Sequence, residues 1–254
     1  MKTRTLLLAG CAAEPVLAPI TMTNGQGEIA GEVTVDSVIL QSRLTTEALI
    51  VDGDVPGVPG VARFELAVSE SDPDGVSSDF ANTMESPWLD ATVERDFIVQ
   101  TKMVGLAGGT RYVYRLRYGP SPDNTRVGPV RSFSTLPGAD GATEVDFVVV
   151  TGMNFNPFYA DGPRAGSPED KTLGYPALET ILGKQLEFFV ATGDNVYYDV
   201  PFGRFERTQT LMRQKWHEQL VQPRFIADGH REKEMGHGHE ALGRHQLVDP
   251  GARV

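Results

Sequence analysis

The sequence changes character once along its length, and this change limits the possible folds more than any other feature. Before residue 136, short apolar stretches alternate with polar residues and end at turns that contain Gly or Pro. After the Pro- and Gly-rich segment 136–142, the apolar stretches become continuous, as in 145–150 and 188–191. Alternation indicates half-buried strands, whereas continuous runs suit strands buried on both faces of a parallel sheet. We therefore expect a β-rich part followed by an α/β part.

Several short strands are expected in the first part. The candidate strand segments are 33–40, 61–68, 97–101, 112–118 and 130–135. Turn sequences such as Asp72-Pro73-Asp74-Gly75 separate them, so an antiparallel β-sandwich is expected. A Gly-Leu-x-x-Gly-Thr turn at 105–110 leads into a Tyr-x-Tyr strand. This resembles the E–F corner of fibronectin type III domains, in which a tyrosine hydroxyl ties the turn to the strand.

The second part is typical of a β–α–β unit with a right-handed crossover. Apolar residues on one face predict a helix over 173–184, and a second helix is expected over 206–221. Two buried strands cannot close a stable α/β domain, so we expect this domain to be incomplete. Both strands end in Thr-Gly, at 151–152 and 192–193. Ligands of open α/β sheets bind outside these carboxyl ends.

Composition excludes some classes of function. The chain has 254 residues, with 23 Lys and Arg against 34 Asp and Glu, a net charge of −11. An acidic balance argues against a nucleic-acid groove. No apolar run approaches the roughly 18–20 residues that a membrane-spanning helix needs.

The single cysteine, Cys11, can form neither an internal disulfide nor a Cys-rich zinc site. It follows Lys2, Arg4 and a leucine run, in the sequence Leu8-Ala9-Gly10-Cys11. This segment resembles the bacterial lipobox, in which the cysteine receives a lipid. The resemblance implies that 1–19 is a signal and tether that anchors the chain to a membrane in the periplasm or at the cell surface. The alternative is a ragged first strand with an incidental cysteine.

Asp194 is the strongest candidate for a metal ligand. It stands on the Gly193 turn after a buried strand, and Asn195, Tyr197 and Tyr198 add oxygen donors. Oxygen ligands suit calcium, magnesium, manganese or ferric iron. On Gly-Asp alone, the better interpretation is a strand-to-helix turn in which Asp194 caps the helix.

The longer segment 193–199 is similar to the Gly-Asp-x-x-Tyr motif of the PhoD-like alkaline phosphatases, which belong to the calcineurin-like metallophosphoesterases. Residues 31–44, the 105–118 corner and Phe133-Ser134-Thr135 resemble the same family, so the resemblance spans 20 to about 225. It implies a fibronectin III-like sandwich over 20–137 and a partial metallophosphatase α/β domain over 143–225. The implied activity is phosphoester hydrolysis at a dinuclear centre, often iron with calcium, that activates a water.

The resemblance makes Asp194 the metal-bridging carboxylate and Tyr197 a ligand of the iron. The family's first strand ends in Ser-Cys, whose cysteine is a further iron ligand, but this chain has Gly152-Met153 there. A thioether is a poor ligand for ferric iron. Asn154 is a candidate to replace the missing cysteine, and Asn195 is a candidate for a further metal ligand. The identity of the metal therefore stays open.

The segment 226–254 has no sustained helical or strand period and holds four of the chain's 5 histidines. The family's later His and Asp ligands do not appear there, and His237-Gly238-His239 is typical of a weak adventitious site. We interpret this segment as a frameshifted tail and expect this chain to be nearly inactive. The alternatives are a non-catalytic binding or spacer protein whose working part is the β-sandwich, or a gene fragment. The identity of the substrate, the choice between a phosphomonoester and a phosphodiester, and the oligomeric state all stay open.

The remaining candidates have structural interpretations. Trp88 and Trp216 are expected to be core or interface anchors. His217 is expected to be packed or solvated on its helix, and Asp199 to be a turn residue or a carboxylate behind the metal ligands.

Overall fold

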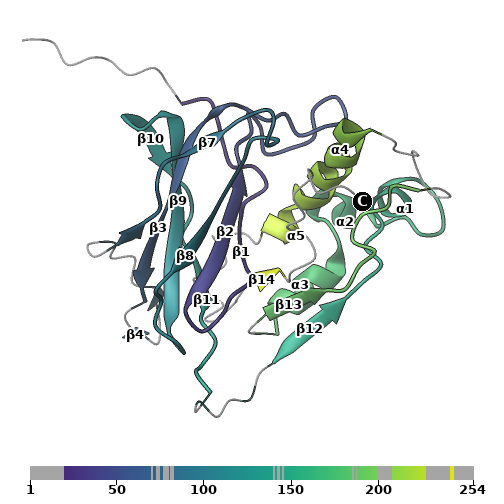
Figure 1. Cartoon of the computed structure of the whole chain (residues 1–254). Coiled ribbons are helices and arrows are strands. Elements are labelled where there is room, and N and C mark those ends of the chain that lie inside the picture. The colour runs from purple at the N-terminus through teal and green to yellow at the C-terminus, as the bar shows by residue number, and fades with distance from the viewer. Residues whose placement is uncertain are drawn as a thin grey trace, which may run out of the picture.

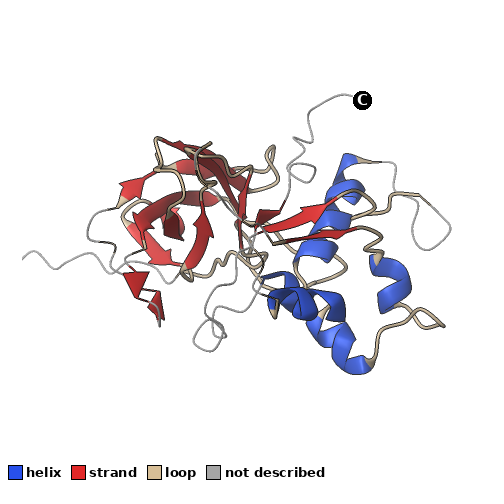
Figure 2. Ribbon diagram, turned by 90° about the horizontal axis from the view of Figure 1, so that it is seen from below, coloured by secondary structure: helices blue, strands red, loops and turns tan. Residues whose placement is uncertain are grey.

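The computed structural model describes residues 20–69, 71–72, 75–76, 80, 83–139, 141, 144, 146–184, 186, 188–199, 208–226 and 241–242. Cys11 and the predicted signal segment lie outside these residues, as does nearly all of the tail beyond 226. Figure 2 shows most strands at one end of the molecule and the helices at the other, around two strands. Within the described residues, no helix is both long and apolar enough to cross a membrane.

Two sheets make up most of the molecule (Figure 1). One has six strands in the order β12-β13-β14-β1-β2-β8. The other has the order β10-β9-β3-β6, with β11 paired to β9 and β7 paired to β3, and β4 and β5 form a separate pair. The strands are β1 (Glu28–Gly31), β2 (Ser37–Arg43), β3 (Gly60–Val68), β4 (Ser71–Asp72), β5 (Gly75–Val76), β6 (Met84–Glu85), β7 (Leu89–Ala91), β8 (Ile98–Val104), β9 (Arg111–Ser121), β10 (Asn124–Val127), β11 (Arg131–Ser134), β12 (Phe147–Val150), β13 (Phe188–Ala191) and β14 (Ala241–Leu242).

The main core lies between the two sheets, which confirms the expected sandwich. Leu40 of β2 and Val99 of β8 belong to the same buried cluster as Phe64 of β3 and Leu116 of β9. Alternate residues of a strand point to opposite faces, so the Tyr-x-Tyr pattern of β9 sends Tyr112 and its neighbours at every second position into this core. Val33 and Val35 fall outside β2, in the loop that precedes it.

The tyrosine at the 105–110 turn is confirmed as the tie between turn and strand. The backbone N–H of Ala107 donates to the Tyr112 hydroxyl at 2.8 Å. Gly105 and Gly109 have φ of 78° and 61°, values that favour glycine. The turn sequence and the tyrosine therefore act together at this corner.

The helices all belong to the second part. They are α1 (Phe155–Tyr159), α2 (Pro168–Leu173), α3 (Pro176–Leu182), α4 (Gln209–Leu220) and α5 (Pro223–Ile226). β12 and β13 are parallel, with Phe147 opposite Phe188, and the helices α1 to α3 lie between them in the chain. This order confirms the expected β–α–β unit, and α4 confirms the helix expected over 206–221.

The single helix expected over 173–184 is wrong. Leu173 ends α2, and α3 begins only at Pro176. Gly174 between them has a φ of 98°, which breaks the helix, and a proline at the first helical position starts a new one. The chain therefore turns at Tyr175 instead of continuing straight.

Burial of β12 on both faces is also wrong. Phe147 is 52% exposed and Val149 is 53% exposed, while Val148 and Val150 pack on the second, smaller core cluster. Only one face of β12 is covered within the described residues, because successive side chains alternate between faces.

The two parts share a sheet, which the sequence patterns did not predict. Leu242 of β14 pairs with Gly31 of β1 on one side and with Phe189 of β13 on the other, both in parallel. The strands of the α/β part thereby continue into a sheet of the sandwich. The division into domains at 137–143 stays a prediction.

Helix α4 is also fixed to the loops of the sandwich (Figure 1). His217 lies between Asp54 and Asp96, and the Gln26 side chain donates to the His217 carbonyl at 3.1 Å. His217 is therefore a packed residue, one of the two possibilities expected for it.

Candidate functional site

The carboxyl ends of β12 and β13 lie side by side. The Thr151 hydroxyl donates to the Gly193 carbonyl at 3.0 Å, and the Thr192 N–H donates to the Val150 carbonyl at the same distance. The two Thr-Gly sequences thus tie the ends of the strands together. The loops that follow them, 152–154 and 193–199, open on the same side of the sheet.

Asp194 stands in a strained turn at this edge. Gly193 has a φ of 125°, and Asp194 itself has a φ of 54°, in the left-handed region that few non-glycine residues adopt. Its side chain is exposed. The alternative role as a helix cap is wrong, because residues 195–199 are not helical.

Asp194, Tyr197 and Asp199 form an electrostatically linked group. The pKa of Tyr197 is raised, first by burial, then by the charge of Asp194, a hydrogen bond with the Asp194 side chain and the charge of Asp199. Two nearby carboxylates thus hold the phenol in its neutral form. A cation bound beside these residues would lower the pKa of Tyr197.

The two asparagines of the predicted site have different positions. Asn154 precedes α1 without capping it through its side chain, and it lines the pocket beside Tyr197. Asn195 is only 6% exposed, and within the described residues its Oδ1 has no hydrogen-bond partner. Asn154 is therefore placed to meet a ligand, whereas the Asn195 side chain is buried.

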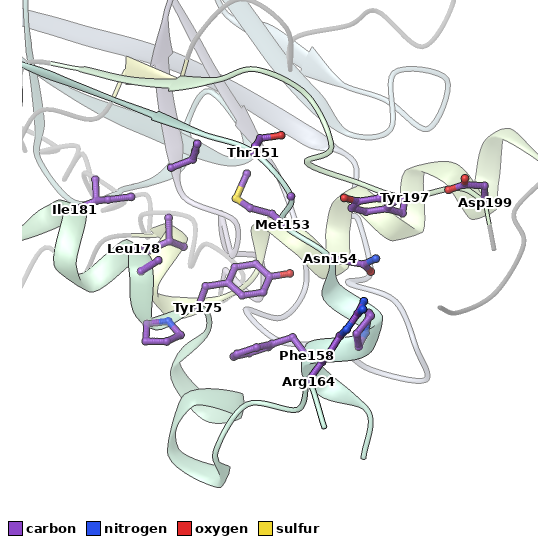
Figure 3. Close-up of a pocket in the computed structure, with 15 residues that line it drawn as sticks. Thr151, Met153, Asn154, Phe158, Arg164, Tyr175, Leu178, Ile181, Tyr197 and Asp199 are labelled. Atoms are coloured by element: carbon purple, nitrogen blue, oxygen red, sulfur yellow. The ribbon is translucent and has the colours of Figure 1, made fainter. Parts of the chain in front are cut away.

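A pocket of about 620 Å³ opens beside this group (Figure 3). Its two ends differ in character. Leu178 and Ile181 lie at one end, and Tyr197, Asn154 and Asp199 lie at the other, with Tyr175 between them. Its lining consists of Val150, Thr151, Gly152, Met153, Asn154, Pro157, Phe158, Arg164, Tyr175, Pro176, Ala177, Leu178, Ile181, Tyr197 and Asp199.

The sequence motifs missed several residues of this pocket, among them Phe158, Arg164 and Tyr175. Burial raises the pKa of Tyr175 well above its usual range, so its hydroxyl is a hydrogen-bond donor. The only sequence signal was the Gly174-Tyr175-Pro176 break, which places an aromatic residue at the start of α3. No spacing rule connects it to the Gly-Asp motif.

Side chains of α4 support the loop 193–199 from below. The Trp216 indole N–H donates to the Tyr198 hydroxyl. Lys215 and Glu218 are buried and line a small cavity together with Asn154 and Tyr197. Trp216 is therefore an interface anchor, as expected. Trp88 lies elsewhere, with the Arg63 guanidinium 4.9 Å from its ring centre.

The donor set suits part of a metal site but not a dinuclear centre. Asp194 and Asp199 offer carboxylates, and Tyr197 and Asn154 offer further oxygens near them. Two ions need several ligands each. Within the described residues, no group of three or more His, Cys, Asp or Glu side chains lies close enough together to hold a metal ion. We therefore derive no catalytic step through two metals.

Comparison with solved structures gives one similarity over most of the chain. The structure of PhoD matches with a TM-score of 0.57 and 18% identity, over 90% of this chain and 39% of that one. This chain thus spans 39% of the length of the PhoD structure. No family model and no curated protein matches the sequence.

Smaller β-domains match about half of the chain. A fibronectin type III domain of human collagen alpha-1(XX) matches with a TM-score of 0.29 and 12% identity, over 53% of this chain and 96% of that one. The third fibronectin III domain of human KIAA0343 has a TM-score of 0.29 and 13% identity, over 53% and 100%. The match that covers most of the chain shows that this protein has a PhoD-like fold, of mixed α/β composition.

Proposed function

We propose that this chain carries the substrate-binding side of a phosphoester hydrolase of the alkaline phosphatase D type. The observation that supports this most is the position of Asp194 and Tyr197. They lie together at the carboxyl ends of two parallel strands, in a chain whose fold is PhoD-like over 90% of its length. Open α/β sheets bind their ligands at this edge.

The proposed metals are iron and calcium, with Asp194 and Tyr197 as ligands and Asn154 beside them. When bound, such ions supply a positive charge for the phosphoryl oxygens and an activated water. The described residues offer too few ligands for two ions, so we expect hydrolysis near background from this chain. The proposed location is outside the cytoplasm, with Cys11 lipidated and the chain held at a membrane surface.

Metal titration followed by an activity assay tests the proposal. Calorimetry with calcium, and separately with iron, is expected to show one weak site in the wild type and none in Asp194→Asn. With both metals present, the wild type is expected to hydrolyse an aryl phosphate at the same rate as Asp194→Asn. Wild-type activity that disappears in Asp194→Asn would overturn the expected inactivity. Absence of metal binding in both proteins would refute the phosphoesterase proposal.

The second candidate function is that of a non-catalytic binding or spacer protein whose working part is the β-sandwich. The distribution of the core favours it. The sandwich cluster includes buried residues from both sheets, whereas among the described residues the cluster of the α/β part has three that are buried, Leu178, Phe189 and Ala191. A metal titration without binding, together with a folded chain, is the result expected for this alternative.

A further inference from the structure

The apolar end of the pocket is continuous with the small core of the α/β part. Leu178 is buried there, and Val150, Met153 and Ile181 pack against the same cluster. All four also line the pocket. One end of the pocket is therefore an apolar surface formed by β12 and α3, beside the acidic group at its other end.

Two aromatic side chains in contact with each other form a fixed wall between the ends. The rings of Phe158 and Tyr175 lie 4.7 Å apart, tilted by 58°. The Tyr175 hydroxyl donates to the Gln219 side-chain oxygen at 3.1 Å, and the Tyr175 N–H donates to that of Gln222 at 3.2 Å. Both glutamines are buried. These bonds orient Tyr175 before any ligand enters.

Phe158 is held from behind by the backbone. A Cβ added at Gly166 would come within 2.6 Å of the Phe158 ring, so the ring rests directly on this glycine. Walls that do not move on binding reduce the entropy lost by the protein and favour a rigid, flat ligand over a flexible alkyl chain. The volume of about 620 Å³ lies within the range of about 300–1,000 Å³ that is common for small-molecule sites.

We propose that this pocket binds a phosphoester whose organic group is an aromatic ring. The ring lies against Tyr175 and Leu178, and the phosphoryl group lies toward Tyr197. The phosphoryl half of this inference rests on the proposed function. The carboxylates of Asp194 and Asp199 repel an anion, so a bound cation should strengthen binding of the phosphoryl group but not of the ring.

Equilibrium binding to the full chain separates the two halves. Phenylphosphonate, methylphosphonate, butylphosphonate and the uncharged benzyl alcohol are titrated with and without calcium. Phenylphosphonate is expected to bind about tenfold more tightly than methylphosphonate or butylphosphonate. Benzyl alcohol is expected to bind without calcium.

A pair of matched variants places the ring. Ala177 and Thr180 are both exposed on α3, but only Ala177 lines the pocket. Ala177→Trp fills the apolar end and is expected to weaken the binding of phenylphosphonate and of benzyl alcohol about tenfold. Thr180→Trp is expected to leave both affinities unchanged. Equal affinity for phenyl- and butylphosphonate, or no difference between the two variants, would overturn the proposal.

Calcium dependence reports on the proposed function separately. If the ring preference holds but neither calcium nor Asp194→Asn changes phenylphosphonate binding, the phosphoesterase assignment fails and an aromatic site remains. If calcium and Asp194→Asn matter but the preference for the ring is absent, the ring site fails and the proposed function stands.

Discussion

The Nε2 atom of His217 lies 2.7 Å from Oδ2 of Asp96, and its Nδ1 atom lies 2.7 Å from Oδ1 of Asp54. Both ring nitrogens of His217 thus face carboxylate oxygens, which accept hydrogen bonds. Arg43 binds the other oxygen of Asp96 at 3.3 Å. These contacts fix α4 to two loops of the sandwich.

Removing the ring should destabilise the fold considerably. His217→Ala removes the ring from the buried Asp96, which keeps its contact with Arg43. It also leaves the Asp54 oxygen that faced the ring with the Val55 N–H, 2.7 Å away, as its remaining donor. We expect a loss of about 3 kcal/mol in the free energy of unfolding, at the low end for buried pairs because Asp54 is partly exposed. Urea denaturation measures it. Thr210→Ala, on the exposed part of α4, is the control, and equal values for the two variants would contradict the expectation.

The same contact predicts acid sensitivity. Burial raises the pKa of Asp96, but the hydrogen bond and charge of His217, with the charges of Arg43 and Arg213, outweigh it and leave the pKa below 3.8. A lowered pKa stabilises the fold above the unfolded value, and this stabilisation is lost as the pH falls through the folded value. The free energy of unfolding should therefore decrease below pH 3.8, and less steeply in Asp96→Asn. Parallel curves for the two proteins would count against this linkage.

The tyrosine at the 105–110 turn gives a third prediction. Tyr112→Phe removes the acceptor of the Ala107 N–H and should lower the free energy of unfolding by about 1–2 kcal/mol. Tyr118→Phe removes a bond from the exposed Arg126 at 2.9 Å and should cost less. Thermal or urea denaturation of both variants decides the order. A larger loss in Tyr118→Phe would mean that the corner is not an important contact.

A fourth prediction concerns the strained turn. Glycine adopts the φ of 54° at position 194 without steric cost, so Asp194→Gly should raise the free energy of unfolding by about 1 kcal/mol or less. The same variant should lose metal binding. Asp199→Gly, in the same loop without a positive φ, should not stabilise the chain. If Asp194→Gly is less stable than the wild type, the strain does not serve to position a ligand.

The success of sequence reasoning depended on how local each feature is. The Tyr-x-Tyr strand and the Gly-Leu-x-x-Gly-Thr turn are local patterns, and both are confirmed in β9 and at Tyr112. The prediction of one helix over 173–184 was wrong because it gave more weight to the shared apolar face of Leu173 and Leu178 than to the helix breakers Gly174 and Pro176. Those breakers are what place Tyr175 in the pocket.

Features built from distant segments could not be predicted. His217 meets Asp54 and Asp96 from positions 163 and 121 residues away, and no periodicity relates them. The pocket likewise combines residues after β12, at α3 and after β13. Asp194 and Tyr197 were found from their motif, and their roles as ligands, like lipidation of Cys11, stay predictions.

The position of β12 at the edge of its sheet has a practical consequence for handling the protein. Its outer edge has no paired strand within the described residues, and the side chains of Phe147 and Val149 are exposed on one face of the strand. An open edge with apolar side chains is a template for irregular association at high concentration. Solubility in concentrated samples should thus be limited by this strand, and a lysine at position 149 is the smallest change that would protect it.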